Sequence, residues 1–357
     1  MASTASQVPH AITVIYSETD KKAADEIEPI IVAIEHDKDL IVYRVRVAAG
    51  MELAANEARG SGHVNPSANT GAGGIAVIYP DVGEPYRSVF ARIIEGIEEQ
   101  SKSRVARFVL SANLNLEDIS NELRRQNVRV VIVLGRNGLK AATGLDRDIG
   151  VIAGGVLSIP EADARNISVL SLAPDPALLL ARLKAFMPAA KRVFVVYDPN
   201  QNAWLLRLAK EAARTRGLEL VSHEASDLKT ALRIYQDIFA SADPRTDALW
   251  LPQDSTTVDE ASVLPLVLQE TWGRNLVFFS SNVAHVRRGA LFSLYPDNVE
   301  IGRHLANSAL GYLSSGGHGP RGVLPLKAVR LAVNVRTAGH LGINLAGSQI
   351  ALIFPEQ

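Results

Sequence analysis

The sequence predicts an α/β protein with two similar lobes, each built around a parallel sheet. Short runs rich in Val, Ile and Leu alternate with segments whose apolar residues recur every three or four positions. The apolar runs do not alternate regularly with polar residues, which is typical of strands covered on both faces. Two blocks of this alternation meet near Pro174–Pro188. We therefore expect two sheets whose strands are connected by right-handed crossovers.

Six segments after residue 74 are expected to be strands. They are IAVIY (Ile75–Tyr79), VARFVL (Val105–Leu110), RVVIVLG (Arg129–Gly135), RVFVVY (Arg192–Tyr197), ALWL (Ala248–Leu251) and LVFF (Leu276–Phe279). Two intervening segments show helical periodicity. YRSVFARIIEGIEEQ has a face formed by Phe90, Ile93, Ile94 and Ile97, and WLLRLAKEAARTRG has one formed by Leu205, Leu208, Ala209 and Ala212. The second helix should end at Gly217.

The first 73 residues are predicted to form an N-terminal β-α-β-like extension and a linker. ITVIYSETD, from Ile12, resembles IAVIYPDVG, from Ile75, and IEPIIVAIEHD resembles FARIIEGIEEQ in the same order. The turn-rich stretch GSGHVNPSANTGAGG separates the two units and has the composition of a flexible linker. The likeness reflects either a duplication or another copy of a common pattern, and the sequence leaves both interpretations open.

The composition excludes several classes of function. With 37 Lys and Arg against 38 Asp and Glu, the chain has no excess of basic residues for binding nucleic acid. It contains no Cys, hence no thiolate ligand or thiol nucleophile, and no apolar run of the roughly 20 residues that a membrane helix needs. The start MASTASQVPH shows no signal-peptide pattern, so an exported protein would be represented here in a processed or altered form.

Motifs for catalysis, cofactors and metals are missing from the sequence. GAGG precedes a strand instead of following one, and GRNGLKAATG lacks the spacing of a phosphate loop. The eight His residues are scattered, and the sequence has no HExxH or GxSxG motif. We therefore predict no catalytic residue, no cofactor and no metal ligand.

The segments that follow the predicted strands form the candidate site. These segments are PDVGEPY, GRNGLK, AGGV, DPNQNAW, PQDSTTV and SSNVAH. Taken singly, each is an ordinary turn, but in open parallel sheets such loops gather at the carboxyl edge, where ligands bind. TVDE has capping-box spacing and fixes a helix start beside Asp254, and Pro85 suits a first helical turn. Six polar loops facing one cleft indicate a small-molecule site.

Nine residues in or beside these loops are candidate ligand contacts. Backbone amides at the helix starts near Arg136–Gly138 and Asn202 can hold a carboxylate. Asp254 can pair with an ammonium group, or it can bond to nearby amides and stabilise its own turn. Tyr86 and Trp204 can enclose an apolar body, although Trp204 can equally pack inside its lobe. The predicted contacts are Tyr86, Arg136, Asn137, Gly155, Asn202, Trp204, Asp254, Ser281 and Asn282.

From Ile75 to about Leu345 the chain resembles the ABC-transporter substrate-binding proteins whose best-known members bind tryptophan or tyrosine. The likeness rests on PAAKRVFVVYDPNQNAW, DALWLPQDSTTV, RRGALFSLYPDNVEIGRHLANSAL and LAVNVRTAGHLGINL. It implies a type I periplasmic binding protein fold with a three-segment hinge. Lobe 1 would then comprise residues 74–173 and 290–318, and lobe 2 residues 174–289 and 319–357.

The resemblance further implies that the protein is not an enzyme. It would bind an amino acid or a related small molecule between its lobes in the periplasm and deliver it to an ABC permease, without inserting into the membrane itself. Two loops depart from the family pattern. The family's GT-type loop reads GRNG here, and its DP loop reads AGGV. Both departures lie in the first-lobe half of the expected pocket. They therefore change residues that would contact the amino-acid ligand that the resemblance implies.

Two other classes of function are compatible with this fold. An α/β enzyme acting on a sugar or a nucleotide would need a perturbed acid–base pair or a metal site in the cleft. A ligand-sensing domain of a regulatory system would carry a DNA-binding or signalling module. The sequence shows no such acid–base or metal motif, and residues 1–74 are neither basic nor similar to a helix-turn-helix.

Overall fold

The computed structural model describes residues 10–17, 40–47, 74–110, 116–157 and 164–355. The chain divides into two compact units, residues 1–64 and 65–357. In the first unit, strands β1 (His10–Ser17) and β2 (Leu40–Val47) pair in parallel, with His10 opposite Leu40. A parallel pair requires a crossover connection, as a β-α-β unit has. The helix and the linker expected in this region lie outside the described residues.

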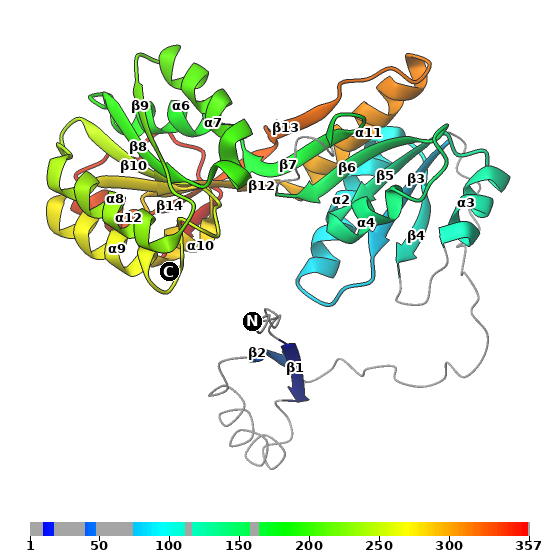
Figure 1. The fold of residues 1–357 in the computed structure, drawn as a ribbon, viewed down its shortest axis with the longest axis horizontal. Coiled ribbons are helices and arrows are strands. Elements are labelled where there is room, and N and C mark those ends of the chain that lie inside the picture. Colours follow the sequence, from blue (N-terminus) through cyan, green and yellow to red (C-terminus); the bar gives the residue numbers. More distant parts are fainter. Residues whose placement is uncertain (1–9, 18–39, 48–73, 111–115, 158–163, 356–357) are drawn as a thin grey trace, which may run out of the picture. The chain divides into compact units, whose positions relative to one another are not determined.

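The first sheet of the second unit is fully parallel, with the strand order β13-β7-β6-β5-β3-β4 (Figure 1). Its strands are β3 (Ile75–Pro80), β4 (Ala106–Leu110), β5 (Val130–Leu134), β6 (Gly150–Val156), β7 (Ser168–Pro174) and β13 (Gly322–Leu326). Helices α2 (Tyr86–Ser101) and α11 (Asn298–Ser314) bury their apolar faces on one side. Helices α3 (Leu116–Arg125) and α4 (Gly135–Ala142) cover the other side.

The second sheet has the order β15-β14-β12-β11-β10-β8-β9, and its one antiparallel pair is β12 with β14. Its strands are β8 (Arg192–Tyr197), β9 (Glu219–Glu224), β10 (Asp247–Leu251), β11 (Val277–Ser280), β12 (Phe292–Pro296), β14 (Val329–Asn334) and β15 (Leu352–Phe354). Helices α6 (Pro176–Phe186), α7 (Pro199–Arg214) and α12 (Val335–His340) pack on one face. Helices α8 (Leu228–Ser241), α9 (Val263–Arg274) and α10 (Val283–Arg288) pack on the other.

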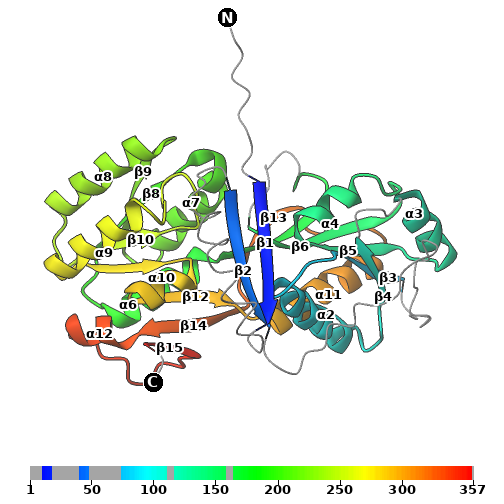
Figure 2. The same ribbon diagram turned by 90° about the horizontal axis from the view of Figure 1, so that it is seen from below.

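Three crossings connect the two sheets (Figures 1 and 2). They run from β7 to α6, from β12 to α11 and from β13 to β14. The Asp175 amide donates to the Leu326 carbonyl at 2.8 Å, and the Asp297 amide donates to the Ala328 carbonyl at 3.0 Å. The side chain of Asp175 caps α6 and that of Asp297 caps α11. Each crossing is therefore bonded to another at the point where the chain changes lobes.

The fold class is the predicted one, with two α/β lobes and a three-segment hinge, but the lobe boundaries differ at two strands. Residues 290–318 were expected in lobe 1, yet β12 pairs with β11 and β14 in the second sheet. Residues 319–357 were expected in lobe 2, yet β13 pairs with β7 in the first sheet. The change of lobe occurs at Pro296–Asn298, where Asp297 follows β12 and caps α11.

Two glycines set the distance between α2 and α11. A methyl group added at Gly96 would lie 1.9 Å from the Val299 carbonyl oxygen, and one added at Gly302 would lie 1.9 Å from the Ile93 carbonyl oxygen. The two helix backbones are therefore in contact at this point, and no side chain fits between them. This close packing fixes α11 to the first lobe although the strands on both sides of it in sequence belong to different sheets.

We predict that Gly302→Ala lowers the free energy of unfolding by at least about 1–3 kcal/mol, because the helices must separate to admit the methyl group. Urea-induced unfolding of the full chain measures this loss. Gly311→Ala is the matched control in the same helix, since nothing lies within 4 Å of a methyl group at Gly311. The control should be neutral or stabilising by up to about 1 kcal/mol, as expected from helix propensity. Equal stability of the two variants would contradict close packing at Gly302.

Candidate functional site

A cavity of about 530 Å³ lies between the carboxyl ends of the two sheets. The first lobe contributes Arg136 after β5, Leu157 after β6 and Ala173 near the end of β7. The second lobe contributes the loops after β8, β10 and β11. Its lining residues are Gln201, Asn202, Pro252, Gln253, Asp254, Ser255, Val258, Asp259, Glu260, Asn282 and His285. This volume is within the range of small-molecule sites.

The Asp254 carboxylate joins two of these loops. It accepts bonds from the Asp198 amide at 2.7 Å and from the Asn202 side chain at 2.8 Å, both on the β8–α7 side. It also accepts the amides of Thr256 at 3.0 Å and Thr257 at 2.9 Å in its own turn. Asp254 is only 6% exposed. Four donors at 3.0 Å or less satisfy its oxygens, and the Gln201 side-chain amide adds a longer contact at 3.5 Å. Asp254 therefore holds the loops in place and has little capacity left for a ligand ammonium group.

Asp198 and Gln201 extend this network. Asp198 caps α7 by accepting the Asn200 amide at 2.9 Å, and it accepts the Thr256 hydroxyl at 2.9 Å. Burial disfavours the charged form of Asp198, but the donors Asn200, Thr256 and Gln201 together outweigh burial and hold its pKa below the usual range. Gln201 accepts the Ser255 amide at 3.1 Å and donates to the Thr256 hydroxyl at 2.9 Å. This wall of the cavity is therefore rigidly hydrogen-bonded.

His285 forms the corner of the cavity at α10. Its Nδ1 lies 2.8 Å from the Ser280 hydroxyl, and its Nε2 lies 3.7 Å from a Glu260 carboxylate oxygen. Burial lowers the pKa of His285 and Arg288 adds to this effect, whereas Glu260 opposes it. Ser280 is fully buried and already accepts the Asn282 amide at 3.0 Å. The Ser280–His285 pair therefore orders the corner, and it does not present a nucleophile to the cavity.

Charges of opposite sign lie on opposite walls. Arg136, exposed at the start of α4, is the cationic residue of the first-lobe wall. Among the described residues it has no ion-pair partner. Asp259 and Glu260 lie on the second-lobe wall, where Asp259 accepts the Ser262 amide at 2.6 Å. The Glu260 side chain is 62% exposed. The Gln253 Oε1 atom is buried and has no partner in the described part of the chain.

The cavity brings together four of the nine predicted contacts: Arg136, Asn202, Asp254 and Asn282. The other five do not line it. Tyr86 begins α2 and is 65% exposed. Asn137 is exposed on α4, next to the lining residue Arg136.

Gly155 and Ser281 have structural roles. Gly155 has a φ of +70°, and a methyl group there would lie 3.3 Å from the Gly135 amide nitrogen, so Gly155 allows β6 to approach the start of α4. Ser281 is buried and accepts the Trp250 indole N–H at 3.0 Å.

The expected helix start at Asn202 is one turn too late. Asp198 is the N-cap and Pro199 the first residue of α7, which is the cap-and-proline sequence typical of helix starts. The Asn202 amide therefore bonds within the helix, to the Asp198 carbonyl at 3.0 Å, and is not free to hold a carboxylate. Asn202 instead directs its side-chain amide to Asp254 and to the Gln253 carbonyl.

Trp204 packs in the core of lobe 2. It is 7% exposed and belongs to the same cluster as Leu205, Leu206 and Ala209. Leu208, which periodicity assigned to the buried face, is 40% exposed. The buried face of α7 is thus rotated toward Trp204. Of the two roles predicted for Trp204, the structure shows packing inside its lobe. The Trp204 indole N–H is buried without a partner among the described residues.

Sequence reasoning missed six polar lining residues: Gln201, Gln253, Ser255, Asp259, Glu260 and His285. All six lie in three loops already selected as candidates, DPNQNAW, PQDSTTV with its continuation, and SSNVAH. Glu260 was assigned to a capping box. The position of these six residues in the cavity depends on how the loops after three different strands pack together. A local sequence pattern carries no information about that packing.

Comparisons with known proteins give one family and a set of similar folds. Residues 176–351 match the model of the family described as ABC transporter substrate binding protein. A ligand-free, open structure of a substrate binding protein with adhesive properties from Clostridium difficile is 16% identical, covers 79% of this chain and 99% of that chain, and has a TM-score of 0.56. At this identity the likeness establishes the fold.

A second solved structure is the ABC domain in complex with L-Trp from Streptococcus pneumonia. It is 17% identical, covers 78% of this chain and 99% of that chain, and has a TM-score of 0.48. A comparison with curated protein sequences gives no match. Within the described residues, no helix has the length and apolar character needed to span a membrane.

We predict that Trp204→Ala lowers the free energy of unfolding by about 3–5 kcal/mol, because it removes a large buried ring from the core. Denaturant unfolding measures the loss. Trp272→Ala is the control, since Trp272 is 41% exposed and should contribute less. A loss below about 1 kcal/mol at Trp204 would contradict its place in the core.

A second variant tests the role of Asp254. Asp254→Asn keeps the shape of the side chain but turns an NH₂ group toward amide donors. We expect it to lower the free energy of unfolding by about 1–3 kcal/mol, the usual cost of unpaired buried groups. Asp259→Asn, in the same loop, should cost less because Asp259 accepts the Ser262 amide alone. Unchanged stability of Asp254→Asn would mean that the carboxylate does not hold the loops together.

Proposed function

We propose that the chain captures a small zwitterionic solute between its lobes and delivers it to an ABC permease, since residues 176–351 match the model of the ABC transporter substrate binding protein family. The cavity between the two sheets is the binding site in this proposal. The observation that carries it is a cavity with a cationic wall and an acidic wall, one of whose lining residues, Gln253, has a buried Oε1 acceptor with no partner among the described residues. A solute with an anionic and a cationic end would match all three features.

The anionic end is assigned to Arg136. Its guanidinium group is the cationic group on the first-lobe wall, and it has no competing ion pair within the described residues. A guanidinium group binds a carboxylate through two parallel hydrogen bonds. Arg136 lies in GRNG, the loop in which the chain departs from the family pattern. The departure therefore supplies a carboxylate-binding group to the first lobe.

The cationic end is assigned to Glu260 and Gln253, in place of Asp254. Asp254 is saturated by its donors, whereas the contacts of Glu260 within the described residues are long, to His285 at 3.7 Å and to Arg288 at 3.8 Å. An ammonium group offers three N–H donors, enough for the Glu260 carboxylate and the Gln253 Oε1 acceptor together. The Gln253 acceptor would then gain the partner that a buried oxygen requires.

The body of the solute should be aliphatic and small. The apolar lining residues are Leu157, Ala173, Pro252 and Val258, and the described lining residues include no Phe, Tyr or Trp. The expected enclosure by Tyr86 and Trp204 has no counterpart in the cavity, so a stacked aromatic ring is not favoured. The proposal is therefore an aliphatic amino acid or a related short zwitterion, bound in the periplasm as the family implies.

A panel of free amino acids tests this proposal by thermal shift and calorimetry. A bound amino acid at 100 times its Kd should add about 2.7 kcal/mol to the free energy of unfolding. We expect an aliphatic amino acid to bind, and its N-acetyl and carboxamide derivatives to bind at least tenfold more weakly. Preference for neutral sugars or nucleosides over every amino acid would contradict the proposal.

Variants then identify the two ends. Arg136→Gln should weaken binding of the amino acid found in the panel by at least tenfold, and Glu260→Gln should do the same. Lys140→Gln is the matched control, because Lys140 is an exposed cation on the same helix that does not line the cavity. Equal affinity of Arg136→Gln and Lys140→Gln would remove Arg136 from the site.

A further inference from the structure

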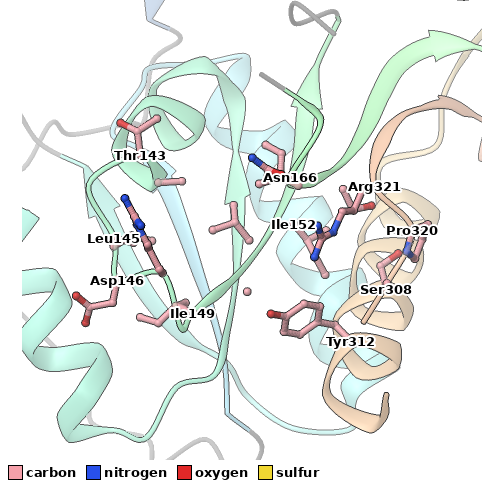
Figure 3. Close-up of a pocket in the computed structure, with 17 residues that line it drawn as sticks. Thr143, Leu145, Asp146, Ile149, Ile152, Asn166, Ser308, Tyr312, Pro320 and Arg321 are labelled. Atoms are coloured by element: carbon pink, nitrogen blue, oxygen red, sulfur yellow. The ribbon is translucent and has the colours of Figure 1, made fainter. Parts of the chain in front are cut away.

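A second cavity, of about 580 Å³, lies at the opposite, amino-terminal edge of the first sheet (Figure 3). Its walls are the loop between α4 and β6, the starts of β6 and β7, the last turns of α11, and the segment that leads into β13. All of these belong to lobe 1. The cavity therefore shares no lining residue with the site between the lobes.

The charges around this cavity are predominantly positive. Two cationic side chains, Arg147 and Arg321, line it together with one anionic side chain, Asp146. Both Asp146 oxygens are bound by the Arg124 guanidinium, at 2.7 and 2.9 Å, so its charge is already compensated. Within the described residues, neither Arg147 nor Arg321 has an ion-pair partner. In the part of the chain that the structure describes, two guanidinium groups thus remain without a counter-charge.

Further hydrogen-bonding groups accompany the two arginines. The Tyr312 ring packs against Gly150, where an added methyl group would lie 2.3 Å from the ring, and this contact fixes its position. Figure 3 shows the Tyr312 hydroxyl and the Arg321 guanidinium pointing into the space between α11 and the strands. Asn166 lines the same space, and its side chain has no hydrogen-bond partner in the described part of the chain.

The remaining lining is largely apolar. Ile149, just before β6, and Ile152, in β6, are buried, and the less buried Leu145 and Pro320 border them. An inorganic anion would leave Leu145 and Pro320 in contact with water, whereas a ligand with a carbon skeleton would cover them. The lining therefore combines anion-binding groups with an apolar floor.

We propose that this cavity binds a small organic anion, with a phosphate or carboxylate group between Arg147 and Arg321 and a carbon body on Ile149 and Ile152. The planar guanidinium groups match the oxygen geometry of both kinds of anion. The Tyr312 hydroxyl and the Asn166 amide supply additional donors. This site is independent of the proposed solute site, whose ionisable lining residues are mainly acidic.

Calorimetry on the full chain at low ionic strength tests the site with glycerol 3-phosphate, citrate and inorganic phosphate as probes. At least one organic probe should bind, and it should bind at least tenfold more tightly than inorganic phosphate. Whether glycerol 3-phosphate or citrate binds more tightly identifies the anionic group. Equal affinity for inorganic phosphate would overturn the organic-ligand proposal, and so would the absence of binding by both organic probes.

Variants locate the probe. Arg147→Gln and Arg321→Gln should each weaken binding of the organic probe by at least tenfold, and the double variant by more. Arg165→Gln, which removes an exposed charge next to Asn166 but outside the lining, should leave the affinity unchanged. Arg136→Gln should also leave it unchanged, which separates this site from the one between the lobes. Binding that survives the double variant, or that is lost in Arg136→Gln, would overturn the proposal.

Discussion

Parallel pairing within each sheet forces the chain to return over a sheet face after almost every strand, so the loops that follow the strands gather at one edge. The candidate site depends on this constraint twice, once in each lobe. The first lobe brings Arg136, Leu157 and Ala173 to its edge, and the second brings the loops after β8, β10 and β11. The three crossings between Pro174 and Val329 then connect the two edges through a single hinge.

Asp254 converts this gathering of loops into a defined wall. A buried carboxylate is stable only when donors surround it, and four donors from two loops do so here. The same bonds remove Asp254 from direct competition for a ligand. In the proposed function, residues with unused hydrogen-bonding capacity, such as Gln253 and Glu260, recognise the solute. A charged residue in a binding cavity can thus serve the site by ordering it.

The two cavities for which ligands are proposed differ in the charge they present. Between the lobes, Asp254, Asp259 and Glu260 outnumber the single Arg136. At the amino-terminal edge of the first sheet, Arg147 and Arg321 remain after Asp146 is paired with Arg124. Because the two sites favour ligands of different charge, one ligand class would not saturate both. A solute carrier with a second, anion-binding site in one lobe is the combined proposal.

The sequence alone determined the fold class and most of the positions from which a site could be built. Strand β8 was predicted at its observed bounds, Arg192–Tyr197, because both faces of a central parallel strand are buried and the composition records it. The candidate loops were identified for the same reason, since they follow such strands.

The tertiary structure decided which side chains enter the cavity. Trp204 faces the core because α7 begins at Pro199 and is rotated accordingly, and Asp254 is saturated because Asp198 and Asn202 approach it from another loop. Strands β12 and β13 lie in the opposite lobes from those predicted, because each pairs with a strand that is distant in sequence, β12 with β14 and β13 with β7. Local periodicity reports burial, whereas the direction of a side chain in a shared cavity depends on contacts between residues far apart in sequence.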